Sequence, residues 1–467
     1  MMTLRPRAAL AKLVNAAAAA LPAQYKSIFT PGNVSNRVLS LAWPSVLEQS
    51  LVTVVGLGDT YIGGHRGAEA IAGVGLGGQV LNLSAALFGA LGVGATAVVA
   101  RAIGANQRRE AEAVAGQAIT VAAVIGAFAS LIVVAFDAPI IAAFGAAPGV
   151  IVQGATWLRV AGPSFIFMGV LLVANANLRG AGDTRTPLAA MIVVNVVNVV
   201  TAWILTRIMG WGVLGTGIGF ALGQISGCLI ALAALFGASR QLRLNIRSLR
   251  PDLTLVKRIL NIGLPAGMEQ IILQIALAYS AVLISGFGTA AYAAHQIAMR
   301  IASLSFLPGW GFSVATTTLV GQGLGANKPE SARESTHAAL RFALIVMTSL
   351  GLGLFVFARP IIGLFTTDAE VIRQGVLAIR IGALAQPLLA QSFIFGGALR
   401  GAGDTRATMV ITMLCVWALR ILVTYFVGNI LGLGIVGAWV AIGVDFATRG
   451  TLFAWRFRSG KWAAVRV

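Results

Sequence analysis

The octapeptide "LRGAGDTR" stands at residues 178–185 and again at 399–406, identical at every position. The two copies are 221 residues apart, and the same offset relates three further pairs of segments without a gap. These pairs are "PSVLEQ" at 44–49 with "PAGMEQ" at 265–270, "GAN" at 104–106 with "GAN" at 325–327, and "FDAPIIAAF" from 136 with "FARPIIGLF" from 357. One offset shared by four separated landmarks indicates that the chain is a duplicated unit.

The composition places this duplicated unit in a membrane. Of the 467 residues, 58% are hydrophobic and 10% charged, with a mean hydropathy of +0.87, whereas soluble domains carry about a quarter charged residues. Apolar stretches near the roughly 20 residues that a helix needs to cross the hydrocarbon core recur along the chain. We predict an all-α integral membrane protein with twelve transmembrane helices, at 38–62, 70–99, 113–136, 150–176, 186–208, 213–238, 259–286, 291–320, 336–358, 371–397, 407–428 and 432–456.

Each repeat holds six of these spans, so both repeats enter the membrane from the same side. Such parallel repeats are related by an axis along the membrane normal, and a transported substrate is expected between the two bundles. The predicted divisions are a cytoplasmic leader at 1–37, a six-helix lobe at 38–238, a basic cytoplasmic linker at 239–258, a second six-helix lobe at 259–456 and a cytoplasmic tail at 457–467.

The positive charge follows the same plan. Lys and Arg number 34 against 15 Asp and Glu, and they gather in the termini and in alternate loops, while loops such as "GFGTAAY" and "VGNILGLG" carry no charge. By the positive-inside rule both termini are cytoplasmic, and this placement argues against a nucleic-acid partner. Residues 1–37 contain no acid; a transit peptide has a similar composition, but we favour a leader on a bacterial inner-membrane protein.

The octapeptide ends the fourth span and begins the fifth. Gly180 and Gly182 permit a tight reversal, Asp183 can cap the next helix, and Arg179 and Arg185 are expected at the level of the lipid headgroups. We favour a capped structural turn, with a gating ion pair at the inner face as the alternative.

The second copy of the octapeptide gives Arg400 and Asp404 the places of Arg179 and Asp183. The same two interpretations, a capped turn or a gate, therefore apply to both lobes.

Four of the fifteen acids fall within predicted spans, where a carboxylate is costly and is a functional candidate by default. Glu48 and Asp59 are eleven residues apart, which places them on one helix face about 16 Å from each other. Asp59 is expected in the path of a coupling ion. Glu48 and Glu269 occupy equivalent positions in the repeat and are either coupling carboxylates or symmetric structural partners. Asp445 is expected near the cytoplasmic end, paired with Arg449 one turn away.

Polar residues inside the spans are candidates for contact with a substrate or for interhelical hydrogen bonds. They include Asn175, Asn198, Gln270 and Gln274, with Asn195 beside Asn198 on the fifth span. The three His residues show no metal-ligand spacing, and Cys228 and Cys415 are expected as small buried side chains. We expect neither a metal nor a cofactor.

Taken together, the motifs resemble the multidrug and toxic compound extrusion family, in its DinF-like branch. The resemblance extends from about residue 38 to 456 and rests on the repeated octapeptide, "GDTYIGG" in the first span and "AAHQIAMRIASLSFLPGWGFSVATTTLVGQGLGAN" in the eighth. It implies a V-shaped pair of six-helix lobes that exports organic cations and other amphipathic compounds against the entry of protons or sodium. Small-molecule substrates, a surrounding lipid membrane and a monomeric state are implied with it.

The resemblance also assigns roles to residues. The acid of the family's "V-D-T" motif couples protons, and it matches "G-D-T" here, hence Asp59. The family's cavity asparagines match Asn175 and Asn198, but Ala202 stands where archaeal members carry an acid. Asp59, together with Glu48, is therefore expected to serve the coupling ion, with H⁺ favoured over Na⁺, whereas the helix-seven Glu of eukaryotic members falls later than Glu269.

Two other classes of protein are possible alternatives for this sequence. A lipid-linked oligosaccharide flippase of the same superfamily would need a cavity rich in basic residues, and Arg300 and Arg420 are the main intramembrane candidates. A membrane-embedded enzyme would need a nucleophile with a base, or a metal cluster. No such spacing appears in the sequence, so an enzyme is not expected.

Overall fold

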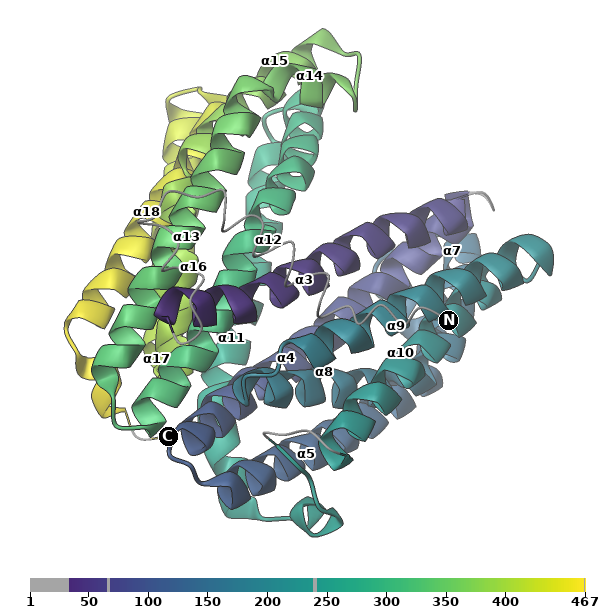
Figure 1. Cartoon of the computed structure of the whole chain (residues 1–467). Helices are drawn as coiled ribbons and strands as arrows, with labels where there is room; N and C mark the ends of the chain where they lie inside the picture. The colour runs from purple at the N-terminus through teal and green to yellow at the C-terminus, as the bar shows by residue number, and fades with distance from the viewer. Residues whose placement is uncertain (1–32, 65–67, 238–241, 466) are drawn as a thin grey trace, which may run out of the picture.

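The computed structural model describes residues 33–64, 68–237, 242–465 and 467, with side chains for all of these except 52–64, 68, 246 and 247. The predicted leader therefore lies outside the described residues up to position 32. The described residues form helices joined by short turns (Figure 1).

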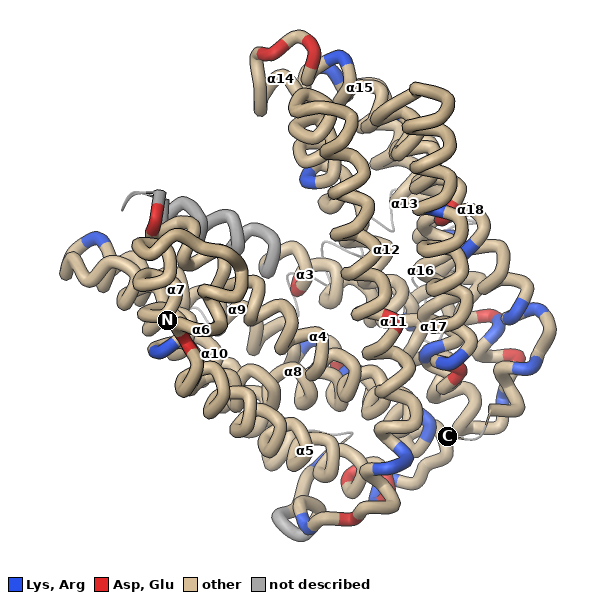
Figure 2. The backbone as a smooth tube through the Cα atoms, turned by 180° about the vertical axis from the view of Figure 1, so that it is seen from behind, with Lys and Arg blue, Asp and Glu red and all other residues tan. Residues whose placement is uncertain are grey.

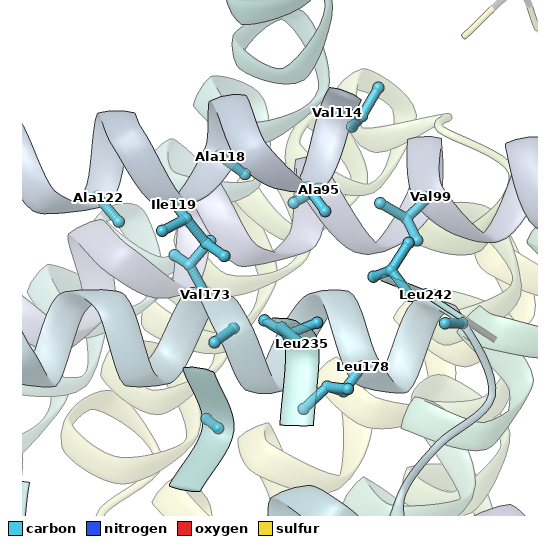
Figure 3. Close-up of a cluster of buried hydrophobic side chains, with 14 of the residues drawn as sticks. Ala95, Val99, Val114, Ala118, Ile119, Ala122, Val173, Leu178, Leu235 and Leu242 are labelled. Atoms are coloured by element: carbon cyan, nitrogen blue, oxygen red, sulfur yellow. The ribbon is translucent and has the colours of Figure 1, made fainter. Parts of the chain in front are cut away.

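The first half of the chain forms one lobe. Its helices are α3 (Val34–Gly64), α4 (Ala68–Gly104), α5 (Arg108–Ala135), α6 (Asp137–Ala142), α7 (Pro148–Ala161), η2 (Gly162–Ser164), α8 (Phe165–Gly180), α9 (Arg185–Trp203), η3 (Ile204–Ile208) and α10 (Val213–Phe236). Figure 3 shows part of the core of this lobe, where small side chains such as Ala95, Ala118 and Ala122 lie between α4, α5 and α8. Small residues let helices approach closely, which is the main source of helix association in a membrane.

The second half repeats this pattern. After η4 (Ile246–Leu249) come α11 (Leu253–Ser285), α12 (Thr289–Gly325), α13 (Pro329–Val356), α14 (Ala358–Gly363), α15 (Ala369–Leu384), α16 (Gln386–Gly401), α17 (Thr405–Met413), η5 (Leu414–Ile421), η6 (Thr424–Ile430), α18 (Gly434–Arg458) and η7 (Lys461–Ala464). Even the short helices α6 and α14 are 221 residues apart.

The described residues contain ten helices that are long and apolar enough to cross a membrane, and the pair α15 and α16, bent by 49°, adds an eleventh. With α3, 31 residues long, the helices agree with the predicted twelve spans. The linker is shorter than expected, because α11 begins at Leu253 rather than at 259. The carboxylate of Asp252 accepts hydrogen bonds from the backbone N–H groups of Thr254 and Leu255 and so caps the helix early.

The two lobes form a V that is closed at one end (Figure 1). The first helix of each half crosses between the lobes at this end. Val38 and Ala42 of α3 are buried in a core built mainly from α12, α13 and α16, whereas Ile259 and Ile262 of α11 are buried in the core of the first lobe. Each lobe is therefore completed by the start of a helix from the other half.

Backbone contact seals the closed end. The two "GAN" segments end α4 and α12, and Asn106 and Asn327 adopt the left-handed conformation, with φ of 60° and 54°. A Cβ on Gly104 would overlap the carbonyl oxygen of Gln322, and one on Gly325 would overlap that of Arg101. These contacts are related by the repeat, so the approximate twofold axis passes between α4 and α12.

Replacing Gly325 by alanine is expected to destabilise this closed end by about 1–3 kcal/mol, the usual cost of overpacking. The matched control is Gly353→Ala on α13, where an added Cβ meets no atom within 4 Å and helix propensity favours alanine. Thermal unfolding of the purified variants in detergent measures the difference. Equal unfolding temperatures for Gly325→Ala and the wild type would contradict the contact.

Candidate functional site

Glu48 lies near the middle of α3 and is paired with Arg179, a residue of the first lobe. Its Oε1 and Oε2 accept hydrogen bonds from Nη1 of Arg179, at 2.9 and 3.2 Å. The side chains are 14% and 20% exposed, so the pair is mostly shielded from solvent. Arg179 was expected at the lipid headgroups, but its guanidinium turns inward because the buried carboxylate needs a partner.

The second lobe builds the same pair from the equivalent residues. Nη1 of Arg400 donates to Oε1 of Glu269 at 3.2 Å. Here the carboxylate also accepts from the hydroxyls of Thr408, at 2.8 Å, and Thr412, at 3.1 Å. The positions equivalent to these threonines are Pro187 and Met191 in the first lobe, and neither side chain can donate a hydrogen bond. Three side chains therefore donate to Glu269, whereas among the described residues Arg179 is the side chain that donates to Glu48.

The turn that carries each arginine has the predicted geometry. Gly182 and Gly403 adopt φ of 90° and 83°, which only glycine adopts readily. Asp183 accepts from the backbone N–H groups of Arg185 and Thr186, so the expected cap forms. Asp404 instead accepts from Nε of Arg456 at 2.8 Å.

The turn in the first lobe also touches the second lobe. The hydroxyl of Thr318 donates to the carbonyl oxygen of Arg179 at 2.9 Å, and Nε2 of Gln322 donates to that of Gly180 at 3.1 Å. Both donors belong to α12. The residue that pairs with Glu48 is thus bonded through its own backbone to the opposite lobe.

Asp59 belongs to the same helix as Glu48, since α3 is continuous from Val34 to Gly64. Its side chain lies outside the described residues, so only its place on the helix is established. Eleven residues of helix separate it from Glu48 by about 16 Å, and α3 runs from the closed end of the V toward the open end (Figure 1).

A cavity of about 300 Å³ lies inside the second lobe. Glu269, Arg400, Arg420 and Arg449 are among the residues that line it. The rest of the wall is largely apolar and aromatic, with Phe306, Trp310, Phe393, Trp439 and Phe446 among its members. The second lobe therefore offers a small chamber with charged groups set into an apolar wall, the usual make-up of a ligand site.

Asp445 was expected near the cytoplasmic end of its helix, and this was wrong. It lies in the middle of α18 and is fully buried. The predicted pair with Arg449 is present at 3.1 Å, and Nη1 of Arg420 also lies 3.8 Å from the same carboxylate oxygen. The sequence predicted one ion pair on the helix surface, and the structure instead has a buried cluster of two arginines and one aspartate.

Four of the polar residues predicted to contact a substrate lie in different surroundings. Gln270 lines the cavity of the second lobe, whereas Gln274 is exposed and is absent from that wall. Asn175 and Asn198 are buried in the first lobe, and both amide atoms of Asn175 lack a hydrogen-bond partner among the described residues. Arg300, one of the two intramembrane basic residues expected of a flippase cavity, is exposed on α12. Arg400 and Arg449 line the cavity, which the sequence did not indicate.

No group of three or more His, Cys, Asp or Glu side chains in the part of the chain that the structure describes is arranged to hold a metal ion. Cys228 and Cys415 are free and buried.

The sequence model of the MatE family matches residues 44–204 and again 265–426, once in each half. The chain belongs to the MatE family. It is 31% identical over 437 residues to the "Probable multidrug resistance protein NorM" of Thermotoga maritima, covering 92% of this chain and 93% of the relative. It is 26% identical to the "Multidrug resistance protein MdtK" of Pectobacterium atrosepticum, covering 82% and 86%.

Solved structures agree on the fold. An outward-facing multidrug resistance MATE family transporter of the MOP superfamily superposes with a TM-score of 0.87 at 23% identity, covering 93% of this chain and 98% of that one. As a MatE protein the chain is a membrane transporter and not an enzyme. The relatives do not favour the flippase alternative.

Thr412→Val is expected to lower the free energy of unfolding by about 1.5–3 kcal/mol, the value of a hydrogen bond to a charged group. The control is Thr336→Val on α13, because that buried hydroxyl donates only to the carbonyl of its own helix at Ala332. In a Glu269→Gln background the cost of Thr412→Val should shrink, as a double-mutant cycle on chemical unfolding would reveal. An unchanged cost in that background would exclude the bond to Glu269.

Proposed function

We propose that this MatE transporter exports organic cations and other amphipathic compounds in exchange for protons, by alternating access, across the inner membrane of a bacterium. The names of the relatives as multidrug resistance proteins support the substrate class. The DinF-like branch and the preference for protons over sodium rest on the motif around Asp59.

The orientation proposed here has both termini and the closed end of the V in the cytoplasm. Most Lys and Arg residues gather around that end, and few lie along the lobes (Figure 2). Positive charge is retained on the cytoplasmic side of bacterial membranes. With this orientation the structure is an outward-facing state, in which a proton enters from outside by way of Asp59 and Glu48.

The observation that carries the coupling mechanism is the link between Glu48 and the closed end. While Glu48 is ionised it holds Arg179, whose carbonyl oxygen accepts from Thr318 of the opposite lobe. Protonation of Glu48 removes the charge that holds the guanidinium, and the end of α8 is then free to leave α12. A proton taken from outside thus favours opening toward the cytoplasm.

We infer a structural role for Glu269 rather than the coupling role of Glu48. Its carboxylate keeps two threonine hydroxyls in addition to its arginine, so it has more partners to lose on neutralisation. We assign it to holding α11 against α16 and α17. The coupling carboxylates are then Asp59 and Glu48, both on α3.

The test is efflux of ethidium from proteoliposomes, driven in turn by a pH gradient and by a sodium gradient. Asp59→Asn and Glu48→Gln are expected to lose transport driven by the pH gradient, while Glu48→Gln keeps ethidium exchange without a gradient, because only proton binding is removed. Glu330→Gln is the control, since that exposed carboxylate pairs with Arg333 on the surface of α13. Wild-type efflux driven by sodium alone, or pH-driven efflux in both α3 variants, would overturn proton coupling through α3.

A further inference from the structure

The charged cluster in the second lobe has no counterpart in the first. The offset of 221 residues holds up to the octapeptide, but the glycines before the last helix, Gly210 and Gly212 against Gly432 and Gly434, are 222 apart, and all four have positive φ. One extra residue therefore lies between these landmarks in the second half. The π-helix η5 accommodates it, because the equivalent part of the first half is α-helical in α9 and a π-turn is an α-turn with one residue inserted.

With this register, Trp439, Asp445 and Arg449 correspond to Gly217, Gly223 and Gly227 of α10. In the first lobe these glycines allow close packing: a Cβ on Gly223 would lie 2.7 Å from the carbonyl oxygen of Val194, and one on Gly227 would overlap the side chain of Val194. Arg420, on η5, corresponds to Asn198. Glycines thus pack the last two helices closely together in the first lobe, whereas the equivalent helices of the second lobe border a charged cavity. Because the first lobe folds without them, Arg420, Asp445 and Arg449 are not required for the fold.

The cavity has an excess of positive charge. Arg400, Arg420 and Arg449 face two carboxylates, and the one at Glu269 is already bonded to Arg400 and two threonines. Asp445 is shared between the other two arginines. One guanidinium charge is therefore in excess when Glu269 of the wall and Asp445, which contacts two of the wall's arginines, are counted together.

The unpaired groups around the cavity are mostly donors. Nε of Arg420, Nε of Arg449 and Nε1 of Trp439 are buried without a hydrogen-bond partner among the described residues, together with the acceptors Oδ1 of Asp445 and Oε1 of Gln386. Buried donors without partners are costly. An acceptor-bearing ligand beside Arg420 and Arg449 would satisfy them after small rotations of these side chains.

The aromatic part of the wall suits an apolar body, and it reaches the charged cluster where the guanidinium of Arg449 lies 5.4 Å from the centre of the Phe446 ring. Trp310 and Phe393 meet edge to face, with ring centroids 6.3 Å apart, and Phe306 and Phe446 do the same at 6.4 Å. The volume of about 300 Å³ is at the lower limit of ligand pockets, which fits a body of one or two rings.

We propose that the cavity of the second lobe binds a small amphipathic anion, with a carboxylate or sulfonate head between Arg420 and Arg449 and an aromatic or acyl body against Phe306 and Trp310. This site lies apart from the α3 carboxylates and widens the ligands of the transporter beyond the cations of the proposed function. The same head chemistry occurs in free aromatic acids and in fatty acids. We expect free aromatic acids to bind better, because of the small volume and the aromatic wall.

The experiment is isothermal titration calorimetry on the full chain in phosphatidylcholine nanodiscs, with naphthalenesulfonate and with naphthylmethylammonium, which shares the rings and reverses the charge. Naphthalenesulfonate is expected to bind at the cavity, whereas any binding of the ammonium, a cation of the class in the proposed function, is expected to be independent of Arg449. Arg449→Gln should weaken binding about tenfold, the equivalent of one charge-assisted hydrogen bond. Arg380→Gln is the control, since that guanidinium stacks on Phe355 in the same lobe and is absent from the cavity wall.

A second variant tests the cavity independently, in case Arg449→Gln does not fold. Ala302→Phe places an aromatic ring in the cavity, keeps all of its charged residues and should abolish naphthalenesulfonate binding. Displacement of naphthalenesulfonate by decanoate would extend the ligand class to acyl anions, whereas failure of decanoate to compete would restrict it to aromatic ones. Loss of ammonium affinity in Arg449→Gln equal to the loss for the sulfonate, absence of anion binding to the wild type, or unchanged anion affinity in Ala302→Phe would overturn the site. Ethidium efflux by the same wild-type preparation reports on the proposed function separately.

Discussion

The two halves of the chain are joined by backbone contact at the closed end of the V, and the rest of the structure depends on it. Gly104 and Gly325 bring α4 and α12 together closely enough that neither position can accept a Cβ without a shift. Around this crossing, α3 and α11 each begin in the core of the opposite lobe. In a membrane, where apolar side chains gain little by leaving lipid, such close packing supplies most of the attraction between helices.

The ion pairs follow from this exchange of helices. Glu48 and Glu269 lie on the two crossing helices, and each is neutralised by the arginine of an octapeptide turn. The turn was expected to be an interfacial anchor, yet its arginine is turned toward the protein interior. The duplicated octapeptide is thus both a helix reversal and the source of the counter-charge for a carboxylate. In the first lobe the same backbone is bonded to α12, which joins a titratable group to the contact between lobes.

Duplication also shows how the halves diverged. A single extra residue in η5 shifts the register of the last two helices, and glycines that close the first lobe are replaced in the second by Trp439, Asp445 and Arg449. A closely packed helix pair thereby becomes the wall of a cavity. The two lobes have the same fold and offer a ligand different surfaces: buried asparagines in the first, arginines and aromatic rings in the second.

The sequence by itself determined the class of protein and its plan. Hydropathy, charge placement and one repeat offset predicted twelve helices in two parallel lobes, because these features depend on composition and spacing alone. The same offset indicated that Glu48 and Glu269 are equivalent. Only the tertiary structure decided their partners, the central position of Asp445 and the cavity around Arg420 and Arg449. Those depend on which face each side chain presents after helices cross and bend, and a one-residue π-insertion changes that face without altering the hydropathy of the segment.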